Sequence, residues 1–299
     1  MIISPSSKEE LGILLSEAKG PIDKIDLSGL NQLIDHTPDD MTATVEAGMK
    51  LSQFQNIIRE KGQWLPVDPP NPETLSIGKL ISTNASGPSR YGFGTIRDWL
   101  IGVRFFLSDG RSIFNGGRVV KNVAGFDLCK LMVGSRGKLG VITEAIFKLT
   151  PIAEKTASLT LTCKSLEEAS GKIDSICSSP MQPSVLDLIR EEGKLYLALS
   201  FSGAKADVES QLQCAESIRG LVSDESSYES RLRKRMKKII SVLPNQLIPT
   251  LNKLKGVDFV SRAGNGIIYV EGEPLLREQS EVEKRVKAQF DPKGILPPL

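Results

Sequence analysis

The chain has 299 residues, enough for one large domain or two ordinary ones with a sizeable core. A composition of 40% apolar and 25% charged residues excludes the fibrous and intrinsically disordered classes. The 38 basic and 36 acidic residues nearly cancel, so the net charge by itself predicts little about partners.

The first residues lack the charged and apolar regions of a signal peptide, and no apolar run reaches the roughly 20 residues of a membrane span. We therefore expect a soluble, cytoplasmic protein. The single histidine, His36, lies in a polar turn and is interpreted as a surface loop residue rather than a metal ligand. Four scattered cysteines are expected to be buried thiols, not a disulfide or iron–sulfur framework: Cys129, Cys163, Cys177 and Cys214.

Residues 6–18 place leucines at helical spacing behind a serine-rich start, which predicts an N-capped amphipathic helix. Asp109 and Gly110 predict a tight turn between two strands. The other elements expected in the first half are strands over residues 22–27, 42–48, 101–107 and 142–149, and a helix over 51–61 ended by Gly62.

After about residue 155 the pattern changes to a second mixture of strands and helices. The expected strands cover residues 157–162, 185–189 and 194–201, with a last hairpin within 256–270. The expected helices cover residues 165–177, 204–219, 228–242 and 274–290. Strands mixed with short helices, without a regular alternation, predict an α+β protein.

Three motifs point to a ligand. Gly134, Gly137 and Gly140 lead into a strand rather than a helix, which excludes a Rossmann site. Residues 69–87 form a segment rich in small residues whose backbone can approach an anion closely; a plain surface loop is the alternative. Residues 118–128 hold Lys121 and Asn122 as polar contacts, or are simply a polar loop between strands.

Together these motifs resemble the FAD-binding PCMH-type domain of the vanillyl-alcohol oxidase superfamily, and most closely its bacterial glycolate oxidase FAD-binding subunits. The resemblance covers residues 38–151 and the tail from Phe290. It departs from the family at Ser76 (usually Thr), Lys79 (usually Gly), Phe126 (usually Tyr) and Pro297 (usually Asn).

The resemblance implies FAD as cofactor, with the small-residue run around its pyrophosphate and the last glycine motif beside its adenine. The implied cofactor-binding residues are Pro70, Ile77, Gly78, Asn84, Ser86, Gly87, Lys121, Asn122, Gly137, Gly140, Val141 and Ile142. The ammonium of Lys79 is a further candidate for holding phosphate. No residue stands out as a catalytic base, and no metal site is expected.

One family segment is missing. Between the first helix and the next strand, roughly 20 residues are absent, including a glycine loop whose amides form the other half of the pyrophosphate cradle. We therefore expect an α+β protein with a PCMH-type FAD-binding domain over residues 1–152, truncated near its N-terminus. A smaller α+β cap-like domain is expected over residues 153–299, with the C-terminal tail returning to the FAD domain.

By resemblance, the chain is an accessory FAD-binding subunit of a glycolate or other 2-hydroxy acid oxidase complex. Its implied partners are a catalytic flavoprotein and an iron–sulfur subunit. The alternative is a flavin-free scaffold subunit acting through protein–protein contact. An independent oxidase with covalent flavin is disfavoured because the family's covalent histidine lies in the missing loop.

A basic run falls on the expected helix over residues 228–242. It is interpreted as a solvated helix face, with docking onto an acidic partner subunit as the alternative. Nucleic-acid binding is not expected, because the rest of the chain is not basic and no aromatic platform accompanies the run. The run comprises Arg231, Arg233, Lys234, Arg235, Lys237 and Lys238.

Overall fold

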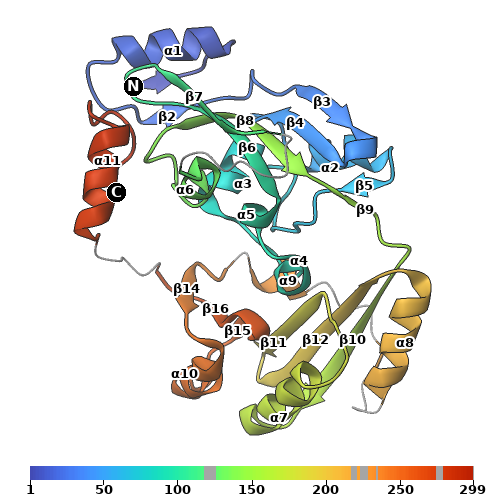
Figure 1. The fold of residues 1–299 in the computed structure, drawn as a ribbon. Helices are drawn as coiled ribbons and strands as arrows, with labels where there is room; N and C mark the ends of the chain where they lie inside the picture. Colours follow the sequence, from blue (N-terminus) through green and yellow to red (C-terminus); the bar gives the residue numbers. More distant parts are fainter. Residues whose placement is uncertain (118–125, 217–220, 223–227, 234, 274–278, 299) are drawn as a thin grey trace. The chain divides into compact units, whose positions relative to one another are not determined.

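The computed structural model describes residues 1–117, 126–216, 221–222, 228–233, 235–273 and 279–298. Its backbone clusters into two compact units, each mixing helices with antiparallel strands (Figure 1). The first unit comprises residues 1–85, 95–152 and 278–299, and the second comprises residues 86–94 and 153–277. The division of function between a cofactor domain and a cap at residue 152 stays a prediction.

The first unit is built on a five-stranded antiparallel sheet. Its strands, in spatial order, are β3 (Leu33–Thr37), β4 (Thr42–Glu46), β8 (Val141–Lys148), β6 (Leu100–Phe106) and β7 (Ser112–Gly116). Two small sheets accompany it: β1 (Ile2–Ile3) beside parallel β2 (Lys24–Ile25), and β5 (Gln63–Trp64) beside antiparallel β9 (Thr150–Pro151). The helices are α1 (Lys8–Glu17), η1 (Pro38–Asp40), α2 (Leu51–Arg59), α3 (Ile77–Thr83), α5 (Ile96–Trp99), α6 (Leu128–Met132) and α11 (Glu281–Phe290).

The core of this unit forms where α2 and α3 cover the sheet. Leu51, Phe54 and Ile58 follow the helical repeat along one face of α2, and all three are buried. The Phe54 ring packs on Phe147 of the central strand β8, with ring centroids 5.9 Å apart. Because β8 lies between β4 and β6, most of its residues are buried and it holds the sheet together.

The second unit contains a seven-stranded antiparallel sheet. Its strands, in spatial order, are β13 (Leu221–Val222), β10 (Lys155–Cys163), β12 (Lys194–Gly203), β11 (Val185–Glu191), β15 (Phe259–Arg262), β16 (Ile267–Val270) and β14 (Lys238–Ser241). The helices are α4 (Arg90–Phe93), α7 (Leu166–Cys177), α8 (Lys205–Glu216), α9 (Tyr228–Leu232), η2 (Pro244–Gln246), α10 (Leu247–Lys253) and η3 (Ala263–Asn265). Residues of α7, α8 and α10 form a core on one face, and α9 covers the other.

The expected helix over residues 228–242 is wrong. The helix ends at Leu232, and Lys238–Ser241 instead forms the edge strand β14, paired with β16. Pairing to an existing sheet satisfies the backbone of β14 and overrides its local helical pattern. Three arginines of the basic run form ion pairs within the unit: Arg231 with Glu191, Arg233 with Glu229, and Arg235 with Asp258. Arg231 and Arg235 are 45% and 47% exposed, as a solvated surface requires, whereas Arg233 is 13% exposed and lies over the Tyr269 ring. Lys234 lies outside the described residues.

Two smaller expectations are also corrected. His36 lies on strand β3 rather than in a loop, and its Nε2 is 2.9 Å from the Gln63 side-chain oxygen. Cys129 and Cys163 are buried as expected, but Cys177 and Cys214 are exposed, and all four are free thiols. Both exposed cysteines lie in helices, α7 and α8, on positions that face away from the sheet core.

Candidate functional site

A cavity of about 430 Å³ lies within the first unit, a size typical of small-molecule sites. Four backbone segments and the C-terminal tail meet around it. The lining comes from residues 22–28, the turn after β4, the start of α3, the loop before β8, and Pro297. Residues far apart in the sequence therefore share one small concave surface.

The loop before β8 forms one side of this cavity. Gly137 has a φ of +75°, a left-handed conformation that favours glycine, and a Cβ there would point into open space. The loop is tied to α3 by hydrogen bonds from the Gly134 amide to the Ile81 carbonyl and from the Arg136 amide to the Ser82 carbonyl. It leads directly into β8 and not into a helix, as the sequence predicted.

The small-residue run contains a helix that sequence analysis missed. Ser76 caps α3, and Ile77, Leu80 and Ile81 bury one face of it, a spacing that could have revealed the helix. The amide of Ile77 donates to the Met49 carbonyl, and that of Gly78 donates to the Ala47 carbonyl. Both amides are therefore engaged within the protein.

The expected cofactor-binding residues are distributed as follows. Those lining the cavity are Gly78, Gly137, Gly140, Val141 and Ile142. Those described in the first unit but not lining it are Pro70, Ile77 and Asn84. Ser86 and Gly87 belong to the second unit, where the Ser86 hydroxyl accepts a hydrogen bond from Arg90. Lys121 and Asn122 lie outside the described residues.

Sequence reasoning missed much of the lining. Residues 22–28 read only as a short strand, and nothing in their pattern marked a ligand site. Gly48 offered a usable signal, because it is a glycine at the end of the strand expected over residues 42–48. An added Cβ there would lie 1.8 Å from the Leu27 carbonyl oxygen, so only glycine allows the two backbone segments of this cavity wall to pack together.

Comparison with protein families identifies this region. Residues 23–114 match the family described as the FAD binding domain. The chain carries a PCMH-type FAD-binding domain. The match begins at the first residues of the cavity wall and includes the turn after β4 and helix α3.

Curated relatives extend the similarity. The chain is 37% identical over 143 residues to the glycolate oxidase subunit GlcE of Escherichia coli (strain K12), covering 47% of the chain and 40% of that protein. It is 33% identical over 160 residues to the glycolate oxidase subunit GlcD of Bacillus subtilis (strain 168), covering 54% and 34%. It is 38% identical over 126 residues to the D-2-hydroxyglutarate dehydrogenase of Xanthomonas citri pv. viticola, covering 42% and 27%. The chain is thus related to FAD-linked 2-hydroxy acid oxidoreductases, but matches less than half the length of each.

A solved structure of alkyldihydroxyacetonephosphate synthase shares the fold. It superposes with a TM-score of 0.75 at 17% identity, covering 99% of this chain and 76% of that chain. At this identity the likeness concerns the fold alone. It agrees with a FAD-binding domain followed by an antiparallel-sheet cap.

The residues present fit part of a FAD molecule. The cavity volume suits a nucleotide portion, and the open space beside Gly137 lets a ligand reach the backbone. Within the part of the chain that the structure describes, the side-chain oxygen of Asn84 is buried without a hydrogen-bond partner. Asn84 lies near Gly134 of the glycine loop but does not line the cavity.

The C-terminal tail closes one side of the FAD-binding domain. The Lys287 ammonium donates to the Asp291 carboxylate at 2.6 Å, to the Lys138 carbonyl at 2.8 Å and to the Pro297 carbonyl at 2.9 Å. Asp291, 4% exposed, also accepts the amides of Ile295 and Leu296. This Lys287–Asp291 clasp therefore joins the tail to the glycine loop of the cavity.

Substituting Asp291→Asn is expected to destabilise the first unit by about 2–3 kcal/mol at neutral pH, because hydrogen bonds to a charged group are lost. Burial alone would raise the pKa of Asp291, but the Lys287 hydrogen bond and other donors outweigh it and lower the pKa below 3.8. A lowered folded pKa means that this stabilisation exists above about pH 4 and is lost as pH falls further. Urea unfolding at neutral and acid pH checks this: the difference between wild type and variant should shrink in acid.

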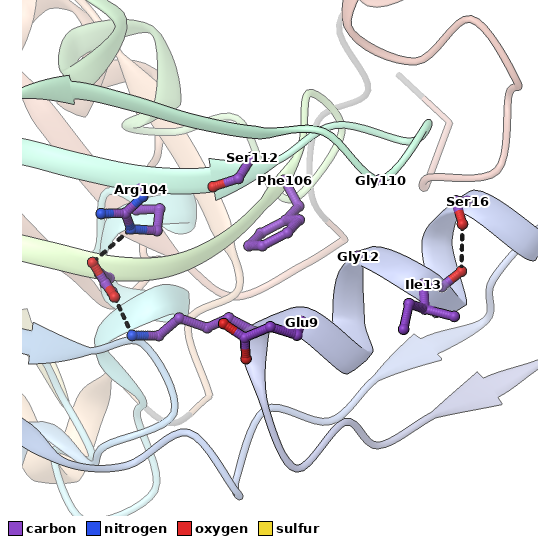
Figure 2. Close-up of a pocket in the computed structure, with 10 residues that line it drawn as sticks. Glu9, Gly12, Ile13, Ser16, Arg104, Phe106, Gly110 and Ser112 are labelled. Atoms are coloured by element: carbon purple, nitrogen blue, oxygen red, sulfur yellow. Dashed lines mark hydrogen bonds and ion pairs between the residues drawn. The ribbon is translucent and has the colours of Figure 1, made fainter.

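A second cavity, of about 670 Å³, lies between α1 and the β6–β7 hairpin (Figure 2). At its charged end, Glu144 accepts hydrogen bonds from Lys8 and, at 2.8 Å, from Arg104. Burial alone would raise the pKa of Glu144, but these two partners outweigh it and lower the pKa. The charges satisfy one another, so we interpret this cluster as a structural tie between α1 and the sheet.

Among the described residues, no group of three or more His, Cys, Asp and Glu side chains could hold a metal ion. The helices in the same described ranges include none long and apolar enough to cross a membrane.

Proposed function

We propose that the chain is the FAD-binding subunit of a complex that oxidises glycolate or another 2-hydroxy acid. The observation that carries this proposal is the glycine-bordered cavity inside a FAD-binding domain. The similarity to GlcE, a glycolate oxidase subunit, supports the subunit role. When bound, FAD supplies hydride and electron transfer, chemistry that protein side chains lack.

The residues of this chain bind and orient the cofactor in this proposal. Gly137, which has open space where a Cβ would lie, lets it approach the backbone, and the Lys287–Asp291 clasp fixes the surrounding loop. We assign no catalytic base. Abstraction of hydrogen from substrate belongs to a partner flavoprotein, and an iron–sulfur subunit accepts the electrons.

A flavin-free scaffold subunit is the alternative. It is favoured by the engaged amides of Ile77 and Gly78, and by the short connection of residues 18–23 between α1 and β2, where the family carries its glycine loop. In that case the unit contributes only surface for protein–protein contact.

The purified chain is expected to show flavin absorption bands after incubation with FAD and gel filtration at low salt. The visible spectrum before and after filtration is the measurement. A protein that stays colourless, and shows no FAD binding by calorimetry at low salt, would favour the scaffold function.

The complex is tested separately by affinity purification from the native host. We expect a flavoprotein and an iron–sulfur protein to co-purify with the chain. Purification of the chain alone would contradict the subunit role, whatever the result of the flavin experiment.

A further inference from the structure

The charged side chains that line the FAD cavity include more basic than acidic residues. Three lysines line it, Lys24, Lys50 and Lys79, together with the two acids Asp23 and Asp26. Asp23 pairs with the N-terminal ammonium, and Asp26 pairs with Lys24. Within the described ranges, neither Lys50 nor Lys79 has an acidic side chain at ion-pair distance, so two positive charges at the cavity lack a counter-charge.

These two lysines lie on neighbouring backbone segments. Lys50 forms an isolated antiparallel bridge with Ser76, the cap of α3, and Lys79 follows in the first turn of that helix. The Lys50 ammonium is held near this edge by a hydrogen bond of 3.2 Å to the Thr74 carbonyl. Both side chains therefore border the same side of the cavity.

The backbone at this side offers few free donors. The amides of Ile77 and Gly78 donate to main-chain carbonyls, and the Lys79 amide donates to the Ser76 hydroxyl at 3.3 Å. An anion placed here must find its donors among side chains. Ammonium groups are strong partners for phosphate oxygens.

We propose that Lys50 and Lys79 bind the diphosphate of the dinucleotide, in place of a cradle of backbone amides. This inference rests on the proposed function, because it specifies which side chains of this chain bind the diphosphate of FAD. Exposed ammonium groups attract phosphate through screened charge, whereas buried amides act at short range in a fixed geometry. Cofactor affinity in this chain is therefore strongly salt-dependent: FAD is retained at low salt and released as the salt concentration rises.

The test is calorimetric titration of the full chain with FAD, ADP and riboflavin at several salt concentrations. Lys50→Gln and Lys79→Gln should each weaken FAD and ADP about tenfold or more, since each removes a charge-assisted contact. Riboflavin, which has no phosphate, should be unaffected. Raising NaCl from about 0.01 M to about 1 M shortens the Debye length from about 30 Å to about 3 Å and should weaken wild-type binding of FAD and ADP.

Lys61→Gln is the matched control, since Lys61 is exposed in the same unit and does not line the cavity. Lys79→Arg should retain most of the affinity. An FAD affinity that changes neither with salt concentration nor in the two glutamine variants would overturn the inference and leave the proposed function standing. Lysine-dependent binding of ADP without any binding of FAD would support the diphosphate site and overturn the flavin function; binding of neither would overturn both.

Discussion

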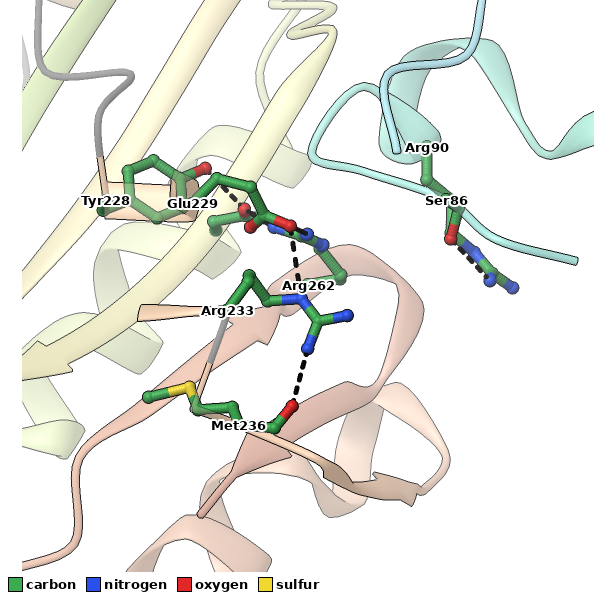
Figure 3. A network of polar contacts seen from close by, with 8 residues as sticks. Ser86, Arg90, Tyr228, Glu229, Arg233, Met236 and Arg262 are labelled. Atoms are coloured by element: carbon green, nitrogen blue, oxygen red, sulfur yellow. Dashed lines mark hydrogen bonds and ion pairs between the residues drawn. The ribbon is translucent and has the colours of Figure 1, made fainter. Parts of the chain in front are cut away.

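Substituting Arg262→Met is expected to destabilise the second unit by about 3–5 kcal/mol, the cost of leaving buried charges without their partner. Arg262 on β15 lies opposite Asp187 on β11, and both side chains are almost fully buried. Figure 3 shows Arg262 beside Tyr228 and Glu229. Its guanidinium donates to the Asp187 carboxylate and lies 2.8 Å from Glu229. The Tyr228 hydroxyl donates to the same Asp187 oxygen at 2.6 Å. Methionine fills a similar volume but leaves both carboxylates without this cation.

The aromatic residues make the measurement specific to each unit. Both tryptophans, Trp64 and Trp99, lie in the first unit, and all four tyrosines lie in the second. Denaturant unfolding followed by tyrosine near-ultraviolet circular dichroism therefore reports the second unit, and tryptophan fluorescence reports the first. The tyrosine transition should shift and the tryptophan transition should not.

Arg235→Met provides the control for this experiment. Arg235 also pairs with a carboxylate, that of Asp258 at 2.9 Å, but its side chain is 47% exposed. Exposed pairs contribute at most about 1 kcal/mol, because water solvates the separated charges. Equal stability of the two variants would contradict a stabilising role for the buried network.

The loss in Arg262→Met should also depend on pH. Burial raises the pKa of Asp187 from 3.8 to about 6, although Arg262 opposes the shift. Because the folded pKa exceeds the unfolded one, the stability from this carboxyl is fully present below about pH 4 and is lost as pH rises through about 6. Removing Arg262 raises the folded pKa further. The variant should therefore lose more stability relative to wild type above pH 7 than near pH 5.

Substituting Gly48→Ala is expected to disrupt the wall of the cavity in the first unit and to destabilise this unit by about 3 kcal/mol, as overpacking against backbone does. The added Cβ would lie 1.8 Å from the Leu27 carbonyl oxygen and 2.5 Å from that of Leu30. The Gly48 amide also donates to the Leu30 carbonyl at 2.8 Å. Main-chain atoms cannot rotate aside as a side chain would, so residues 27–30 must move.

Tryptophan fluorescence during urea unfolding measures this loss, and titration with FAD measures the effect on the cavity. Gly20→Ala is the control, because a Cβ at Gly20 meets nothing within 4 Å. We expect the Gly48 variant to lose FAD affinity as well as stability. Wild-type stability and affinity in Gly48→Ala would show that the wall yields without cost, contrary to the close contacts.

Local signals predicted the elements that depend on local interactions. The serine cap and leucine spacing placed the first helix, observed as Lys8–Glu17 with Ser7 as its cap. The Asp109-Gly110 turn placed the β6–β7 hairpin, and Gly110 has the positive φ that such a turn requires. These elements could be predicted because a helix cap, a turn and a hydrophobic periodicity each depend on only a few neighbouring residues.

Elements that depend on distant partners were not predictable in the same way. Residues 238–241 have an apolar and basic pattern compatible with a helix, yet they pair with β16 as an edge strand. His36 reads as a loop residue, but pairing of β3 with β4 makes it part of a sheet. The competing structures have similar local free energies, so long-range pairing decides between them.

The sequence by itself determined the α+β class, and its glycine motifs singled out Gly78, Gly137 and Gly140, which line one cavity of the first unit. Only the tertiary structure brought residues 22–28, Gly48 and Pro297 to the same cavity, and showed that the amides of Ile77 and Gly78 are engaged. The physical reason is that a glycine's freedom is a property of its own backbone, whereas a cavity wall and an unbalanced charge arise from segments that meet only when the chain has folded.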